Sequence, residues 1–196
     1  MSQRLVLAPA NPDKARELAA LLEGFEVVLR PVDLADVEET ADTLEGNARL
    51  KAEAVVAATG ELAVADDTGL EVDALGGRPG VYAARYAGPS ATYADNVAKL
   101  LGELAGVPHA ERRARFRTVA VAAFADRREI VAEGTVEGTV VDVPRGEGGF
   151  GYDPVFVPDD GDGRTFAEMT QAEKAAVSHR GRALRSLAAQ LSQIKP

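Results

Sequence analysis

The spacing of apolar residues along the chain predicts strands that alternate with helices in the first half. Short apolar runs, typical of buried strands, occupy residues 4–8, 25–30 and 62–65. Helical spacing of leucines and alanines, with a glycine directly after each segment, predicts helices over residues 12–23 and 44–59. This order of strand, helix, strand, helix and strand is typical of an α/β fold.

The second half of the chain adds a predicted hairpin. Two long strands are expected over residues 115–125 and 129–141, on either side of a polar turn. Further helices are expected over residues 93–104 and 178–193, and a short strand over 155–157. A hairpin beside strands that are joined through helices predicts a mixed β-sheet.

Composition limits the classes of protein that fit this pattern. With 196 residues, 46% of them hydrophobic, the chain can bury one good core, so we expect one domain over residues 1–196. The formal net charge of -9 disfavours nucleic acid and anionic membrane surfaces as partners. The absence of cysteine excludes disulfides, zinc–thiolate sites and a thiol nucleophile. The first apolar run is too short for a signal peptide or a membrane span, so a cytoplasmic location is the default expectation.

A turn suited to binding phosphate follows the first predicted strand, in the sequence LAPANPDK. Asn11 and Pro12 are typical of a helix start, and Lys14 lies in the first turn of that helix. The free N–H groups and the dipole of a helix N-terminus attract an anion, which the lysine would neutralise. The alternative is that Asn11 is only a helix cap.

Two acidic segments could supply ligands for Mg²⁺. Asp66 and Asp67 end the predicted third strand, where alternation points their side chains to opposite sides. Glu38 and Glu39 lie before the second helix. Mg²⁺ takes a few carboxylate oxygens together with waters and substrate phosphates. The alternative is a solvated acidic turn.

A glycine-rich segment, GEGGFGYDPVF, places Phe150 and Tyr152 in flexible backbone. It leads into a strand and does not open a helix, which excludes a dinucleotide-binding fingerprint. An aromatic ring on such a loop is suited to stacking on a planar base. The alternative is that both rings pack under the loop as part of the core.

A basic patch is expected near the start of the last helix. Lys174, His179 and Arg180 surround a predicted cap at Ser178 in an otherwise acidic protein. Donors fixed at a helix start suit carbonyl or phosphate oxygens. A lone histidine is usually structural, but a cluster of three basic residues favours a binding role.

Together these segments resemble the inosine/xanthosine triphosphate pyrophosphatase family over essentially the whole chain. The most specific matches, in this order, are ADDTGLEVDALGGRPGVYAARYAG, GGFGYDPVF and EKAAVSHRG. The resemblance implies an elongated α/β domain with a central mixed sheet flanked by helices, a homodimer, and Mg²⁺ as cofactor. It also implies hydrolysis of ITP, dITP and XTP to the nucleoside monophosphate and pyrophosphate, which cleans the nucleotide pool.

The resemblance further implies roles for the residues that match the family's motifs. Asn11 and Lys14 match the phosphate-binding turn, and Asp67 matches the carboxylate that binds metal and activates water. Glu38 is favoured over Glu39 as the second metal ligand. The base and substrate pocket is matched by Thr68, Phe150, Gly151, Tyr152, Asp153, Lys174, His179 and Arg180.

In that pocket, Phe150 would stack on the purine, while His179 and Arg180 would donate to its 6-oxo group. Adenine carries an amino donor at this position, so two donors would face each other and ATP should be rejected. Guanine keeps the 6-oxo group, so its rejection must come from contacts around its 2-amino group.

The first motif departs from the family, which usually has Ser or Thr and then Gly before the asparagine. Pro9 and Ala10 stand in these places, so a hydroxyl and an N–H donor for phosphate are missing. Two alternatives therefore stay open. One is a Mg²⁺-dependent pyrophosphatase that acts on other nucleotides, and the other is a nucleotide-binding protein with a weakened phosphate turn.

Overall fold

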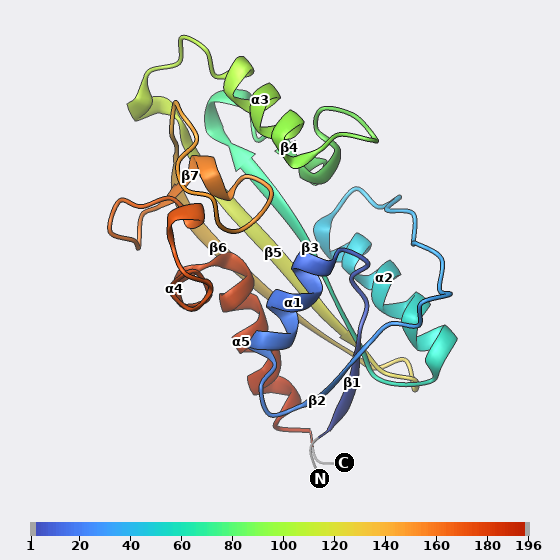
Figure 1. The fold of residues 1–196 in the computed structure, drawn as a ribbon. Coiled ribbons are helices and arrows are strands. Elements are labelled where there is room, and N and C mark those ends of the chain that lie inside the picture. Colours follow the sequence, from blue (N-terminus) through green and yellow to red (C-terminus); the bar gives the residue numbers. More distant parts are fainter. Residues whose placement is uncertain (1–2, 195–196) are drawn as a thin grey trace. The chain divides into compact units, whose positions relative to one another are not determined.

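The computed structural model describes residues 3–194 and has the predicted α/β fold (Figure 1). Its strands are β1 (Arg4–Leu7), β2 (Glu26–Leu29), β3 (Ala63–Val72), β4 (Pro79–Gly80), β5 (Arg113–Ala123), β6 (Glu129–Val140) and β7 (Phe156–Pro158). Its α-helices are α1 (Pro12–Leu21), α2 (Leu44–Thr59), α3 (Tyr93–Glu103), α4 (Gln171–Val177) and α5 (His179–Leu191). Within this described part, no helix is long and apolar enough to cross a bilayer.

The strands form one mixed sheet in the order β2-β1-β3-β5-β6-β7, with β4 paired to β3. β1 runs parallel to both β2 and β3, and Val6 lies opposite Val28 on one side and Ala63 on the other. β4 and β7 pair antiparallel with β3 and β6. Parallel neighbours need a crossover connection, which α1 and α2 provide, so the alternation read from the sequence explains this half of the sheet.

The described chain folds into two compact units, and each has a core of its own. Unit 1 contains residues 3–67, 118–134 and 180–194, and unit 2 contains residues 68–117 and 135–179. β3, β5 and β6 contribute residues to both units. A single domain over residues 1–196 stays a prediction, and its first two and last two residues lie outside the described chain.

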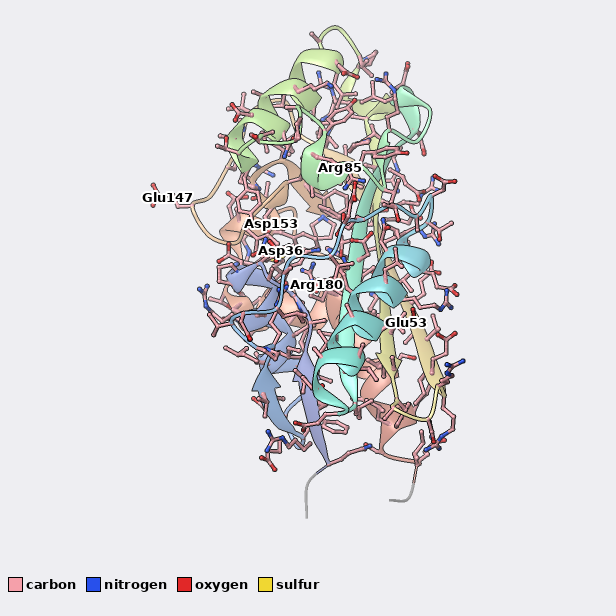
Figure 2. The ribbon with its side chains drawn as sticks, turned by 90° about the vertical axis from the view of Figure 1, so that its right-hand side faces the viewer. Asp36, Glu53, Arg85, Glu147, Asp153 and Arg180 are labelled. Atoms are coloured by element: carbon pink, nitrogen blue, oxygen red, sulfur yellow. The ribbon has the colours of Figure 1, made fainter. Side chains whose placement is uncertain are left out.

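In unit 1, β1 and the first part of β3 are buried on both faces. Leu5 and Val64 belong to a core that they share with leucines of α1 and α5. Val6 and Ala63 are equally buried and, by strand alternation, face the other side. α2 covers that side with its buried alanines (Figures 1 and 2). In this part of β3, even-numbered residues therefore face α1 and α5, and odd-numbered residues face α2.

The core of unit 2 concentrates the aromatic side chains of a chain that has few of them. The rings of Phe116 and Phe156 meet edge-on with their centroids 4.7 Å apart, and Phe166 lies 5.3 Å from Phe156. α3 adds Val97 and Leu100 to this core. Edge-to-face contacts of this kind stabilise a core beyond the area they bury.

One strand extends further than its sequence predicts. The apolar run predicts a strand that ends at residue 65, but β3 continues through Asp66 and Asp67 as far as Val72. Two adjacent carboxylates indicate a turn because burying an unpaired charge is costly. In the fold both carboxylates are buried and both have cationic partners, so the strand can continue.

Gly138 of β6 lies directly against β7. A Cβ atom there would come within 2.3 Å of the carbonyl oxygen of Val157 and 2.5 Å of Cζ of Phe156. We expect Gly138→Ala to lower the free energy of unfolding by about 1–3 kcal/mol, because one strand must shift. Urea denaturation followed by circular dichroism measures this loss.

The matched control is Gly102→Ala in α3, where a Cβ atom would meet nothing within 4 Å. Alanine favours a helix over glycine by up to about 1 kcal/mol, so stability should be kept or increased. Equal stability of the Gly138 and Gly102 variants would contradict the packing of β6 on β7.

Candidate functional site

Polar side chains of unit 1 gather around the two aspartates of β3. We call this group the charge cluster, and its members are Lys14, Glu17, Glu39, Asn47, Lys51, Asp66, Asp67 and Arg180. Asp66 and Asp67 are both buried, and as neighbours on a strand they point to opposite faces. Since α1 and α5 cover one face and α2 the other, each carboxylate meets a different set of partners.

Asp66 points to the face covered by α1 and α5. Nε of Arg180 donates to Oδ2 of Asp66 at 3.1 Å, and the same guanidinium donates to Oε2 of Glu17 at 2.5 Å. Burial opposes the charge of Asp66, but Lys14 and Arg180 outweigh it and hold the pKa of this carboxyl far below its usual range. Burial also opposes the charge of Arg180, yet Asp66 and Glu17 raise its pKa. Both groups are therefore charged at neutral pH.

Asp67 points to the other face, where α2 presents two side chains one turn apart. Nζ of Lys51 lies 2.9 Å from Oδ1 of Asp67 and 2.9 Å from Oε1 of Glu39. Nδ2 of Asn47 donates to Oδ2 of Asp67 at 3.4 Å. Residues four apart lie on the same helix face, which lets Asn47 and Lys51 reach both oxygens of one carboxylate.

The pKa values of the two aspartates shift in opposite directions because their surroundings differ. Burial raises the pKa of Asp67, and the nearby charge of Glu39 adds to this, while Lys51 opposes it. For Lys51 itself, burial would lower the pKa, but the surrounding carboxylates of Asp67, Asp66 and Glu39 outweigh burial and raise it. Asp67 is thus the more readily protonated of the two neighbours.

The predicted phosphate turn has its cap in place. Oδ1 of Asn11 accepts hydrogen bonds from the N–H groups of Asp13 at 2.9 Å and Lys14 at 3.3 Å, which confirms Asn11 as the N-cap of α1. Burial is the main cause that lowers the pKa of Lys14, and Asp66 partly offsets it. Because Asn11 already occupies two backbone donors of the helix start, Lys14 is the group of this turn best placed to neutralise an anion.

The acidic segment before α2 brings a different glutamate to Asp67 from the one favoured by the sequence. Glu38 is exposed, whereas Glu39 is half-buried and pairs with Lys51. Lys51 itself was missed by sequence reasoning. The sequence feature that could have identified Lys51 is its place beside the apolar face of α2. Ala48 and Ala52 lie on that face and are buried.

The charge cluster has a donor set that fits a hard divalent cation. Among residues 3–194, no three His, Asp or Glu side chains lie close enough to hold a metal ion by themselves. Glu39 and Asp67, however, direct one carboxylate oxygen each at a single ammonium group. Mg²⁺ is typically held by one or two carboxylates, with water and substrate phosphate completing its shell, so these two residues suit it.

Unit 2 holds the predicted base-binding residues other than Arg180, several of them in a second group. We call it the ring cluster, and its members are Tyr93, Phe116, Phe150, Asp153, Phe166, Lys174 and His179. Nζ of Lys174 lies 2.6 Å from Oδ2 of Asp153, and both side chains are buried. The same carboxylate oxygen accepts the N–H of Phe150 at 2.8 Å, and Nζ of Lys174 lies 4.7 Å from the Phe150 ring centroid. Asp153 therefore fixes both the loop backbone and the ammonium group beside the ring.

Position 149, immediately before the ring of Phe150, requires a glycine. A Cβ atom at this position would come within 2.1 Å of Oδ2 of Asp153, and its φ of +68° favours glycine. The loop can close on Asp153 only with glycine there. Figure 2 shows Asp153 pointing inward, while Glu147 from the same loop points away from unit 2.

A cavity of about 500 Å³ lies between the glycine-rich loop and α3. Phe150 and Tyr93 line it, and their ring centroids are 5.9 Å apart. Volumes of this size are typical of sites for small molecules. Phe150 is half-buried, whereas Tyr152 is buried.

Two predicted pocket residues pack into unit 2. The hydroxyl of Tyr152 donates to the carbonyl of Ala83 at 2.9 Å, and its ring belongs to the core, as the alternative interpretation has it. His179 is buried and stacks on Phe116 with centroids 4.4 Å apart and an interplanar angle of 13°. Stacking fixes the plane of the imidazole, so any donor role of His179 has a defined direction.

Two boundaries between the units fall between neighbouring predicted site residues. Asp67 ends a segment of unit 1 and Thr68, which is half-buried, begins unit 2. His179 ends unit 2 and Arg180 begins the last segment of unit 1. Arg180 is held by carboxylates of the charge cluster, so its predicted contact with the base stays a prediction. The substrate roles of Thr68, Gly151 and Tyr152 also stay predictions.

Known proteins resemble this chain over nearly its whole length. Residues 5–190 match the model of the Ham1 family. The chain belongs to this family. A dITP/XTP pyrophosphatase of Geobacillus kaustophilus is 48% identical over 197 residues, covering 98% of this chain and 96% of the relative. One of Symbiobacterium thermophilum is 49% identical, covering 94% of this chain and 93% of the relative.

Solved structures of Ham1 proteins share the fold. The Staphylococcus aureus Ham1 protein has a TM-score of 0.86 and 38% identity, covering 98% of this chain and 100% of its own. A nucleoside-triphosphatase, or dITP/XTP pyrophosphatase, of Mycobacterium abscessus has a TM-score of 0.74 and 44% identity, covering 94% and 98%. The family resemblance read from the motifs and the α/β fold class are confirmed.

The buried pair in the ring cluster predicts a measurable loss of stability. Lys174→Met would leave the carboxylate of Asp153 buried without its cation, so the free energy of unfolding should fall by about 3–5 kcal/mol. The double variant Asp153→Asn/Lys174→Met removes both charges and should lose less. Urea denaturation compares the two, and a single variant as stable as the unmodified protein would contradict this account.

Proposed function

We propose that this Ham1-family chain hydrolyses the non-standard purine nucleoside triphosphates ITP, dITP and XTP to the monophosphate and pyrophosphate. Relatives that are 48% and 49% identical carry the name dITP/XTP pyrophosphatase, which supports this substrate class. The observation that carries the chemistry is the pair of carboxylates, Glu39 and Asp67, converging on one cation in unit 1. Such a pair suits metal-assisted transfer of a nucleotidyl group to water.

The proposed cofactor is Mg²⁺, held by Asp67 and Glu39. When bound, the ion would neutralise charge on the phosphates and polarise them. Lys51 supplies the positive charge between the two carboxylates in the structure described here. Glu39 replaces Glu38 in this proposal because Glu38 is exposed and Glu39 shares a cation with Asp67.

The chain's own residues divide the work of the proposed reaction. A water attacks the α-phosphorus, the bond to the bridging oxygen breaks, and pyrophosphate leaves. Asp67 accepts the proton of the attacking water as the proposed general base. Lys14, in the first turn of α1, neutralises the phosphates and the departing pyrophosphate. No covalent intermediate on the protein is required.

Recognition of the base is proposed for the ring cluster of unit 2. Phe150 offers a half-buried ring for stacking, and buried donors on Lys174 and His179 suit the 6-oxo group of hypoxanthine or xanthine. Adenine would face these donors with its amino group. Each buried donor left unpaired costs about 1–3 kcal/mol, so ATP should be a poor substrate.

Two further expectations stay predictions, a homodimer and a cytoplasmic location, and two alternatives stay for the phosphate turn with Pro9 and Ala10: other donors compensate, or phosphate binding is weakened. Pro9 is buried and has no N–H, so it offers phosphate no donor. If the turn is too weak, the chain would bind nucleotide without turnover. That outcome distinguishes the binding-protein alternative from the enzyme.

Substrate turnover tests the proposed function. With Mg²⁺, ITP, dITP and XTP should yield pyrophosphate, while ATP and CTP yield little, as measured by separate assays for pyrophosphate and phosphate. Asp67→Asn should lower kcat for ITP by about 10²–10⁴-fold, since the carboxylate that accepts the proton is lost. The control Asp36→Asn removes an exposed carboxylate and should leave kcat unchanged. Phosphate as product, or full activity of Asp67→Asn, would refute the proposal.

A matched pair of adjacent glutamates tests the metal assignment. Glu39→Gln should raise the Mg²⁺ concentration needed for half-maximal ITP turnover by about 10-fold or more, because a ligand carboxylate is lost. Glu38→Gln should leave that concentration unchanged, since Glu38 is exposed. Titration of initial rates with Mg²⁺ measures both, and the reverse result would restore Glu38 as the ligand.

A further inference from the structure

We propose that Asn47 is a positioning residue that sets the spacing of the two metal-binding carboxylates, Asp67 and Glu39. The inference rests on the proposed function, because it takes those carboxylates as the Mg²⁺ ligands. Asn47 itself touches neither phosphate nor metal in this proposal. It acts through the side chain of Asp67 and through the backbone of Ala41, two residues after Glu39.

The geometry around Asn47 links three segments of unit 1. Its Nδ2 donates to Oδ2 of Asp67 at 3.4 Å, and its Oδ1 accepts the N–H of Ala41 at 3.0 Å. Ala41 lies two residues after Glu39 in the segment that precedes α2. One side chain of α2 thus ties β3 and the Glu39 segment to the same point.

Asn47 is completely buried, and its bond to Asp67 is buried as well, while its bond to Ala41 is part-buried. A buried amide that loses its partners leaves a donor and an acceptor unsatisfied, at the full desolvation cost of each group. Asn47 therefore favours the arrangement in which Asp67 and the Glu39 segment stay together.

Gly46 supports the same tether independently. A Cβ atom on Gly46 would come within 2.6 Å of Cβ of Ala41 and 3.0 Å of Oγ1 of Thr43. The segment carrying Glu39 can approach α2 closely only because position 46 has no side chain. The pair Gly46 and Asn47 thus combines close approach with a hydrogen bond to Ala41.

The second link between the same segments differs in charge. Lys51 also bridges Asp67 and Glu39, but its ammonium competes with any cation for their oxygens. Asn47 is neutral and bonds to the other oxygen of Asp67 and to a backbone N–H. It can therefore hold the two segments in place whether or not a metal ion has replaced the ammonium.

Metal binding without turnover provides the main test. Mn²⁺ is titrated into the nucleotide-free protein, and electron paramagnetic resonance measures the free ion. Asn47→Ala should weaken Mn²⁺ binding by about 10–100-fold, the usual effect of losing a group that orients a ligand. Gly46→Ala, which displaces Ala41 while keeping Asn47, should weaken binding in the same direction. If Asn47→Ala does not fold, Gly46→Ala carries the test alone.

The chain offers a matched control in Asn96 of α3. Asn96 is also buried and also stands four residues after a threonine cap, Thr92 as against Thr43 for Asn47. It donates to the carbonyl of Ala84 at 3.0 Å and accepts the N–H of Ala87 at 2.8 Å. Asn96→Ala should reduce thermal stability but leave Mn²⁺ affinity unchanged.

Kinetics separates positioning from general damage. For Asn47→Ala, the Mg²⁺ concentration for half-maximal ITP turnover should rise by about 10-fold, with most of kcat recovered at saturating Mg²⁺. Unchanged Mn²⁺ and Mg²⁺ dependence in the Asn47 or Gly46 variant, or an equal loss in Asn96→Ala, would overturn the positioning role alone. An unmodified protein that hydrolyses ITP without any divalent cation would overturn the metal assignment and this inference together.

Discussion

Two adjacent, buried carboxylates on β3 must each be neutralised, and the polar architecture of unit 1 follows from this requirement. A buried charge without a partner costs several kcal/mol, and neighbours on a strand cannot share one because they point apart. Asp66 therefore meets Arg180 on one face, and Asp67 meets Lys51 on the other. Each helix layer that covers the sheet has to bring its own cation.

The same separation gives the two carboxylates different chemistry. Cations close to Asp66 lower its pKa, while burial raises the pKa of Asp67. Pairs of acidic groups whose surroundings move their pKa values apart are typical of sites in which one is structural and the other exchanges a proton. In this chain Asp66 anchors α5 through Arg180, and Asp67 is the carboxylate proposed to bind metal and activate water.

Unit 2 meets a comparable requirement with fewer residues. The buried carboxylate of Asp153 is neutralised by Lys174 and also fixes the backbone of Phe150. Gly149 allows this approach because any side chain there would collide with the carboxylate. The result is a ring held beside a buried ion pair, in a loop that its glycines would otherwise leave flexible.

Local patterns in the sequence determined most of the elements, their order and most of the side chains that bear the chemistry. Apolar spacing, caps such as Asn11, and glycine stops act over a few residues, so they can be read without the fold. Tertiary structure alone decided that β3 continues through Asp66 and Asp67, that Glu39 and not Glu38 meets Asp67, and that Lys51 and Asn47 join them. Asp66 and Arg180 are 114 positions apart, and burial brings such residues together through packing of whole elements. No local pattern in the sequence predicts that these two residues pair. The energy of a buried charge depends on its partners, and only the folded chain brings those partners together.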